Sequence, residues 1–152
     1  MISAVVLFLS AITVSNACVP TGTTTTTTPC CTMLSTAALP RRAPSITTQQ
    51  QCSVLQRVSS TCPIDGIVVC DAAQETNPTS ILIQFFNAAG AVVRSQSAPG
   101  TSLSVKVVCV NGEWRVATAT GATTTVPINS VSCSQAGSTG TDRGYVIGTA
   151  VS

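Results

Sequence analysis

Apolar and polar residues alternate along much of the chain from Cys52 onward, with the period of two that is typical of β-strands. The clearest example is Leu103–Thr118, where two β-favouring runs flank Asn111-Gly112. Asn-Gly favours a two-residue type I′ turn, because both central residues of that turn need a positive φ. The segment therefore predicts a β-hairpin. Its register pairs residues across the turn: Val110 with Glu113, Cys109 with Trp114, Val107 with Val116, and Val105 with Thr118.

The two faces of this hairpin differ in polarity, since successive side chains of a strand point to opposite sides. The apolar face holds the only tryptophan of the chain, so we expect it to pack on the core while the other face meets solvent. The apolar face carries Leu103, Val105, Val107, Cys109, Trp114 and Val116. The opposite face carries Ser104, Lys106, Glu113 and Arg115, with Val108 and Val110 as apolar exceptions.

Other short segments also predict strands. In Ser80–Asn87 the residues Ile81, Ile83 and Phe85 share one face, and the other face is mostly apolar too, which favours a central strand with Phe85 in the core. No segment shows a sustained helical period with caps. Six or seven short strands separated by turn residues indicate an all-β fold, a small antiparallel β-sandwich. The further predicted strands are Ser53–Val58, Ile67–Cys70, Ala91–Gln96 and Ile128–Cys133, with turns at Cys62–Gly66 and Pro99-Gly100.

The composition narrows the class of protein. The chain has 152 residues, enough for one modest domain, and its formal net charge of +2 with 8% charged residues does not indicate a nucleic-acid partner. Aromatic residues make up only 3%, so the core is thin. A disulfide typically supplies about 2–4 kcal/mol, which makes a few bridges comparable with the whole stability of a domain. The eight candidates are Cys18, Cys30, Cys31, Cys52, Cys62, Cys70, Cys109 and Cys133.

The N-terminus indicates the compartment in which these cysteines would lie. Met1–Ala17 is apolar, and the small residues Ser15 and Ala17 stand at the −3 and −1 positions of a cut after Ala17. This pattern predicts a signal peptide and a secreted protein that starts at Cys18 and has no membrane span after cleavage. An uncleaved anchor and a bacterial lipoprotein with Cys18 as its first residue are the alternatives.

The mature chain divides into three parts by composition. Residues 18–29 form a Thr-rich linker, in which Thr23–Thr28 is either an O-glycosylated spacer or a plain flexible linker. Residues 30–133 form the cysteine-bearing β domain, and residues 134–152 a Gly/Ser/Thr-rich tail whose removal we expect to be mild. Within the domain, Arg41-Arg42 lies on a predicted loop, either as a dibasic processing site or as two solvated arginines.

The cysteine-bearing part resembles the nematode six-cysteine domain, or C6 domain, a secreted domain of unknown function. The resemblance covers about residues 30–133. It rests on a Thr-rich tract before Cys30-Cys31, on Cys62 followed by Val68-Val69-Cys70, on Val107–Trp114 with its Val-x-Cys-x-x-Gly-x-Trp pattern, and on the closing Asn129–Cys133.

The resemblance also implies a bond between the family's first and third cysteines, which here are Cys30 and Cys62. Cys18 and Cys52 are then surplus to the six and are expected to bond to each other. The remaining four can pair in three ways, and all three stay open: Cys31, Cys70, Cys109 and Cys133. The pairing of Cys109 with Trp114 resembles the tryptophan-on-disulfide core of immunoglobulin-type sandwiches, by analogy alone.

The side chains needed for catalysis are sparse. The chain has no histidine, which excludes Ser-His and Cys-His mechanisms, and it lacks the Cys-x-x-Cys pairs of zinc and redox sites. Asp65, Asp71 and Glu75 lie close in sequence, but without calcium-loop spacing they are expected to be solvated turn carboxylates rather than a cleft or a calcium site. We therefore expect no enzyme, no metal and no cofactor.

Two function classes follow, with a third held in reserve. The first is an extracellular binding or interaction module, whose partner is an unidentified extracellular protein or glycan. The second is a structural component of a cuticle, mucus or matrix layer. An enzyme or enzyme inhibitor is the third. A soluble, saturable binder would favour the first, and recovery only from an insoluble extracellular fraction would favour the second.

Overall fold

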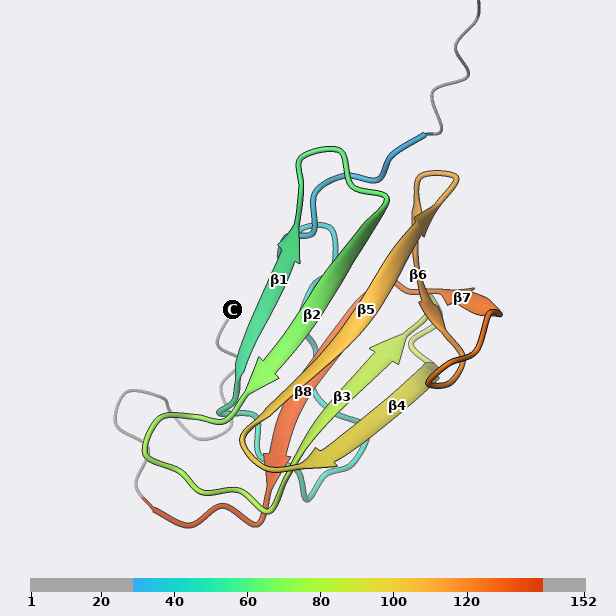
Figure 1. The fold of residues 1–152 in the computed structure, drawn as a ribbon. Coiled ribbons are helices and arrows are strands. Elements are labelled where there is room, and N and C mark those ends of the chain that lie inside the picture. Colours follow the sequence, from blue (N-terminus) through green and yellow to red (C-terminus); the bar gives the residue numbers. More distant parts are fainter. Residues whose placement is uncertain (1–28, 141–152) are drawn as a thin grey trace, which may run out of the picture.

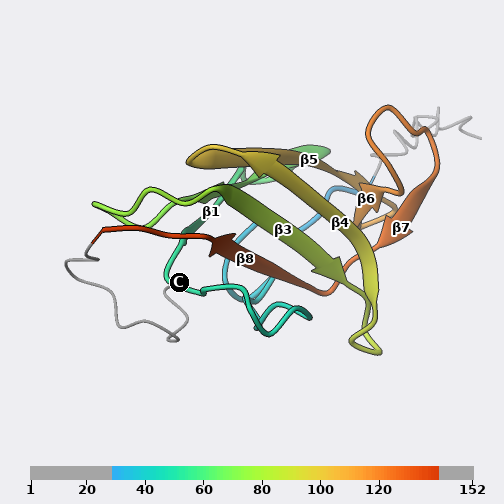
Figure 2. The same cartoon turned by 90° about the horizontal axis from the view of Figure 1, so that it is seen from below.

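Eight strands make up the regular structure of residues 29–140, the part of the chain that the computed structural model describes (Figure 1). They form two antiparallel sheets in the orders β1-β2-β5-β6-β7 and β4-β3-β8, which face each other as two layers (Figure 2). The predicted antiparallel β-sandwich is thus confirmed. The strands are β1 (Val54–Ser59), β2 (Asp65–Asp71), β3 (Ser80–Phe86), β4 (Val92–Pro99), β5 (Ser102–Val110), β6 (Glu113–Ala117), β7 (Thr125–Pro127) and β8 (Ser130–Ala136).

The predicted hairpin is formed by β5 and β6, and β5 is the middle strand of the five-stranded sheet. Asn111 and Gly112 both have positive φ, 52° and 80°, as a type I′ turn requires. The observed pairs are Val110–Glu113, Cys109–Trp114, Val108–Arg115 and Val107–Val116, which confirms three of the four predicted pairs and their register. The predicted Val105–Thr118 pair is not formed, because β6 ends at Ala117.

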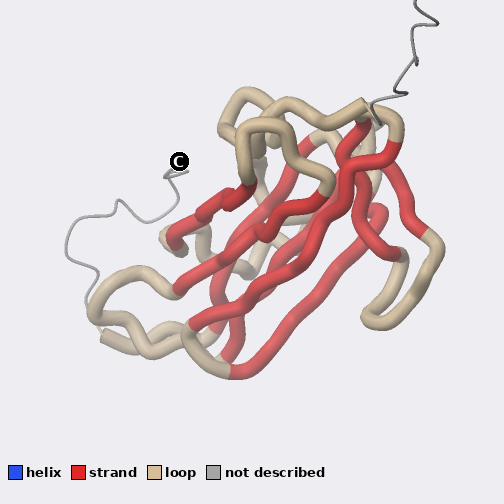
Figure 3. Tube along the Cα trace, turned by 45° about the horizontal axis from the view of Figure 1, so that its top comes forward, coloured by secondary structure: helices blue, strands red, loops and turns tan. Residues whose placement is uncertain are grey.

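The apolar face of the hairpin lies between the two sheets. All four predicted core residues are buried: Trp114, Val105, Val107 and Phe85. They belong to one core cluster that spans both layers and also includes Leu55 and Val131. Helices are absent from the described residues (Figure 3). Within residues 29–140 there is accordingly no helical segment of the length and apolarity that crossing a bilayer requires.

Strand β3 is the central strand of the smaller sheet, and both of its faces are buried, as predicted. Its inner face packs in the sandwich core. Its outer face is covered by the loop of residues 41–50: the guanidinium carbon of Arg42 lies 4.2 Å from the centre of the Phe86 ring, and the backbone N–H of Ser45 donates to Gln84 Oε1 at 2.8 Å. This cover explains why the strand is apolar on both sides.

The structure differs from the prediction at three places. A short strand, β7, stands where the sequence indicated only a connection, because three residues are too few to show alternation. Strand β2 begins at Asp65, so part of the predicted turn is strand. Strand β8 continues past Cys133 to Ala136, beyond the predicted end of the domain.

The last of these differences corrects the expectation that removal of residues 134–152 would be mild. Gln135 is fully buried, and its Oε1 accepts the backbone N–H of Ala73 at 2.8 Å. Its Nε2 donates to Thr76 Oγ1 at 2.9 Å. The polar composition of this strand concealed its burial. The predicted signal peptide, Cys18 and the threonine tract lie outside the described residues.

Candidate functional site

Three disulfides connect six of the cysteines: Cys30–Cys62, Cys31–Cys109 and Cys70–Cys133, with Cα–Cα distances of 5.2, 5.7 and 5.5 Å. The first pair is the one that the resemblance implies. The other two are one of the three arrangements that the sequence left open. Disulfides of this kind persist in oxidising compartments, so the structure is consistent with an extracellular protein.

The adjacent cysteines Cys30 and Cys31 bind two different parts of the five-stranded sheet. Cys62 precedes β2, whereas Cys109 is near the end of β5. The indole Nε1 of Trp114 donates to the carbonyl oxygen of Thr32 at 3.0 Å, immediately after the second bridge. The start of the described chain is therefore fixed to the segment before β2 by one disulfide, and to the hairpin by a second disulfide and one hydrogen bond.

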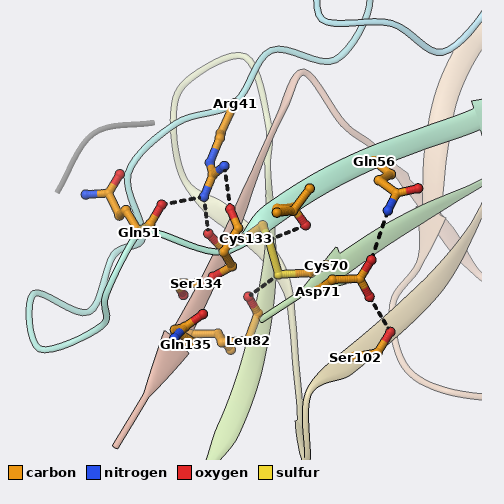
Figure 4. The surroundings of a disulfide bond; sticks show 12 residues. Arg41, Gln51, Gln56, Cys70, Asp71, Leu82, Ser102, Cys133, Ser134 and Gln135 are labelled. Carbon is orange, nitrogen blue, oxygen red and sulfur yellow. Dashed lines mark hydrogen bonds between the residues drawn. A yellow bond between two sulfur atoms is a disulfide. The ribbon is translucent and has the colours of Figure 1, made fainter. Parts of the chain in front are cut away.

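The third disulfide joins the two layers. Cys70 in β2 and Cys133 in β8 are both buried, and their bond crosses the sandwich (Figure 4). Beside it, the Arg41 guanidinium donates to three carbonyl oxygens, those of Cys133 and Gln51 at 2.8 Å and that of Ser53 at 2.9 Å. Arg41 therefore connects the start of the loop that covers β3 to the residues just after that loop and to β8.

These contacts correct the interpretation of Arg41-Arg42 as two solvated arginines. Arg42 is exposed, but Arg41 is half-buried, because the loop carbonyls need a donor where water cannot reach them. Burial lowers the pKa of Arg41, the positive charge of Arg57 lowers that pKa further, and Cys52 acts in the opposite direction. Burial likewise lowers the pKa of Arg57, whose Nε donates to the Leu39 carbonyl at 2.7 Å.

Cys52 is buried and does not belong to the three disulfides. Its predicted partner, Cys18, lies outside the described residues, so a bond between them stays a prediction.

The acidic residues do not converge. Asp65 and Asp71 stand at opposite ends of β2: Asp65 pairs with Lys106 at 2.8 Å, and Asp71 accepts from Gln56 and Ser102. Glu75 lies in the following loop with a φ of 61°. Within residues 29–140, no group of three or more histidine, cysteine or acidic side chains is arranged to hold a metal ion.

One candidate binding site was missed by the sequence analysis, a pocket on the open side of the sandwich beside Arg94 of β4. A bulge shifts the β3–β4 register, so that Val92 pairs with Phe86 but Arg94 pairs with Phe85. Arg94 shares its face with Gln96 and Ala98, which pair with the buried residues Ile83 and Ile81, so it turns inward and is only 8% exposed, while the bulge places Val92 on the opposite face. The polar side chains of this strand do not signal that this face is buried.

Among residues 29–140, the partners of the Arg94 guanidinium are neutral acceptors. Nη1 donates to the Ala117 carbonyl at 2.7 Å, while Nη2 donates to Gln96 Oε1 and to Thr120 Oγ1 at 3.3 Å. These groups border an open pocket of about 240 Å³, which we call the Arg94 pocket. Its remaining lining comes from β5 and from the loop after β6: Ser104, Val105, Lys106, Ala119 and Gly121.

A second exposed feature lies on the outer face of the five-stranded sheet. Val58, Ile67 and Val110 are exposed apolar residues on this face, and together they form what we call the outer apolar strip. The pairs Val58–Ile67 and Ile67–Lys106 place its members on adjacent strands. Two ion pairs lie on the same face, Lys106–Asp65 and Arg115–Glu113.

Comparisons of this chain with protein-family models, with curated proteins and with solved structures find no match. The geometry of the described residues is therefore the basis for the functional argument.

Proposed function

We propose that this chain is a secreted, non-enzymatic binding module, in which disulfides fix the sandwich and the Arg94 pocket contacts the ligand. The disulfide framework supports the extracellular part of the proposal, because thiols are kept reduced in the cytosol. Rigid sandwiches commonly carry binding groups at their loops and edges, where they contribute little to the core.

The observation that carries the binding role is the arginine in the pocket. A buried charge is costly unless an opposite charge or good hydrogen bonds compensate for it. In the described part of the chain the two ion pairs belong to Lys106 and Arg115, so the charge of Arg94 meets neutral oxygens alone. A side chain kept in this way at an open pocket fits recognition better than stability.

The test is a ligand screen with two proteins. The folded, oxidised protein and an Ala119→Trp variant are compared against extracellular polysaccharides and proteins. Ala119 is exposed and lines the pocket, so a tryptophan there fills the pocket without disturbing the core. Saturable binding that the variant loses supports the proposal. Binding that the variant retains in full places the ligand elsewhere and refutes the pocket as the site.

A structural role in an extracellular layer is the second candidate, and the outer apolar strip favours it. Exposed apolar patches mark interaction surfaces. We propose a second copy of this chain as the occupant, because the face carries both signs of charge in its two ion pairs, and a two-fold dimer brings the same patch of both copies together. Sedimentation velocity tests this: an Ile67→Glu variant should stay monomeric where the natural chain dimerises, and a monomeric natural chain would exclude this surface as a self-association site.

A further inference from the structure

The geometry points to a carboxylate-bearing sugar, a uronic acid unit of an extracellular polysaccharide, as the ligand of the Arg94 pocket. This inference rests on the proposed binding function and adds the chemical class of the ligand. It uses three features of the pocket: the charge of its buried arginine, the hydroxyl and amide groups around that charge, and the size of the space.

The charge of the pocket is positive. Lys106 also lines it, but its ammonium group is compensated by Asp65 at 2.8 Å, which leaves Arg94 as the uncompensated cation. A guanidinium has five N–H groups, and the three hydrogen bonds of Arg94 to residues 29–140 use one on Nη1 and two on Nη2. A second Nη1 hydrogen and Nε–H remain for a ligand. Bonds from a guanidinium to a carboxylate are charge-assisted and stronger than those to neutral oxygens.

The groups around the charge match a sugar rather than an apolar ligand. Gln96 and Thr120 line the pocket, and their amide and hydroxyl groups both donate and accept hydrogen bonds, as sugar hydroxyls do. Small apolar residues, Ala117 and Ala119, leave space between them. A volume of about 240 Å³ is below the range for drug-sized ligands and suits one ring-sized unit of a chain that enters from the open side.

Geometry also excludes the other cations of residues 29–140 as equivalent sites. Arg57 donates to the Leu39 carbonyl and does not line the pocket. Arg41 is committed to three carbonyls beside the Cys70–Cys133 bond, and Arg115 is paired with Glu113 at 2.7 Å. Arg42 is exposed on the opposite, outer face of the three-stranded sheet, against Phe86. Arg94 is thus the cation that combines burial, a pocket and neutral partners within the described residues.

The experiment is isothermal titration of the full, oxidised protein with oligogalacturonate as the probe. The same oligosaccharide with its carboxylates methyl-esterified is the matched ligand control, since it keeps the ring and loses the charge. Arg94→Gln is the test variant. Arg42→Gln is the matched protein control, because it removes the same charge from an exposed site away from the pocket. Circular dichroism establishes that both variants are folded.

The inference expects saturable binding of oligogalacturonate, at least tenfold weaker in Arg94→Gln, unchanged within twofold in Arg42→Gln, and absent for the ester. Higher salt should weaken the binding. Equal weakening by the two variants would overturn the inference in favour of diffuse charge attraction. If Arg94→Gln does not fold, titrations of the natural chain with oligogalacturonate and with its methyl ester still test whether the carboxylate is required for binding.

Three further outcomes separate this inference from the proposed function. Ester binding as tight as acid binding, lost in Ala119→Trp, refutes the carboxylate and keeps the pocket as a binding site. Poly-glutamate that competes as well as oligogalacturonate refutes the sugar class. An absence of any oligogalacturonate binding at millimolar concentration refutes the inference, whereas the broader screen with Ala119→Trp decides the proposed function independently.

Discussion

Removal of the Cys70–Cys133 disulfide is expected to be the most damaging change of a single cross-link in the described part of the chain. This bond joins the two layers of the sandwich, and both sulfurs are buried. The perturbation is the double variant Cys70→Ala/Cys133→Ala, which removes the bond without leaving a thiol. Its matched control is Cys30→Ala/Cys62→Ala, which removes a bond that lies near the surface.

The magnitude follows from loop length and burial. Cys70 and Cys133 are separated by 63 residues in sequence and Cys30 and Cys62 by 32. Loop-closure entropy then gives about 4 kcal/mol for each bond, with a difference of only about 0.6 kcal/mol between them. Burial increases the difference between the two losses of stability. Each sulfur removed from the core leaves a void, and a buried void of about a methyl group costs about 1 kcal/mol. We expect a loss of about 6 kcal/mol for the buried pair and about 4 kcal/mol for the surface pair.

The assay is equilibrium unfolding in guanidinium chloride, followed by the fluorescence of Trp114, the only tryptophan of the chain. A loss of about 6 kcal/mol approaches the whole stability of an ordinary domain, about 5–15 kcal/mol. A third variant, Cys70→Val/Cys133→Ala, refills part of the space and should recover about 1 kcal/mol. The reasoning is refuted if the buried pair costs no more than the surface pair, because burial would then contribute nothing.

Four other outcomes are expected. Gly112→Ala should destabilise the hairpin by about 1 kcal/mol, measured by thermal unfolding, through the positive φ of residue 112 alone, because no atom lies within 4 Å of the added methyl group. A neutral effect would contradict the turn assignment. Trp114→Phe should cost about 1 kcal/mol for the lost bond to Thr32 in addition to the lost volume, measured by urea unfolding, and an unchanged midpoint would refute that contact. Gln135→Ala should lower the free energy of unfolding by about 2 kcal/mol, because it leaves the buried N–H of Ala73 without its side-chain acceptor. Hydrogen exchange at the Ala73 amide should become faster, and an unchanged exchange rate would refute the role of Gln135. A dibasic-specific protease should cleave after Arg42 only once the protein is reduced, because Arg41 donates to three carbonyls and the Arg42 N–H donates to the Val131 carbonyl. A cut in the native, oxidised protein, detected by mass spectrometry, would contradict this prediction.

The features that depend on local pattern were predictable from the sequence. Asn111-Gly112 determines both the turn and the register of β5 and β6, and the apolar alternation around Phe85 identifies β3 as central. These features depend only on residues that are close in sequence or on an adjacent strand. The all-β class and the burial of Val105, Val107 and Trp114 follow from the same pattern.

The candidate site was not predictable, because its geometry depends on contacts that are remote in sequence. Arg94 is buried because it pairs with Phe85 on the inner face of β3, and its partner Thr120 comes from the loop between β6 and β7. The burial of Arg41 and Gln135 has the same origin. Both are polar residues in segments of low hydrophobic periodicity, and each is buried by a segment that the pattern treats as a loop.

The adjacent bridges of Cys30 and Cys31 have a mechanical consequence. A pulling force applied at Pro29 passes through sulfur–sulfur bonds to Cys62 and Cys109 before it can peel a strand. Between Cys30 and Cys133 the shortest covalent route runs through Cys62, along β2 to Cys70, and across to β8. Tension between these two ends therefore extends residues 62–70 alone, and the strands from β3 to β6 stay shielded from the load. A domain linked in this way withstands stretching by covalent bonds, whatever the strength of its hydrogen bonds.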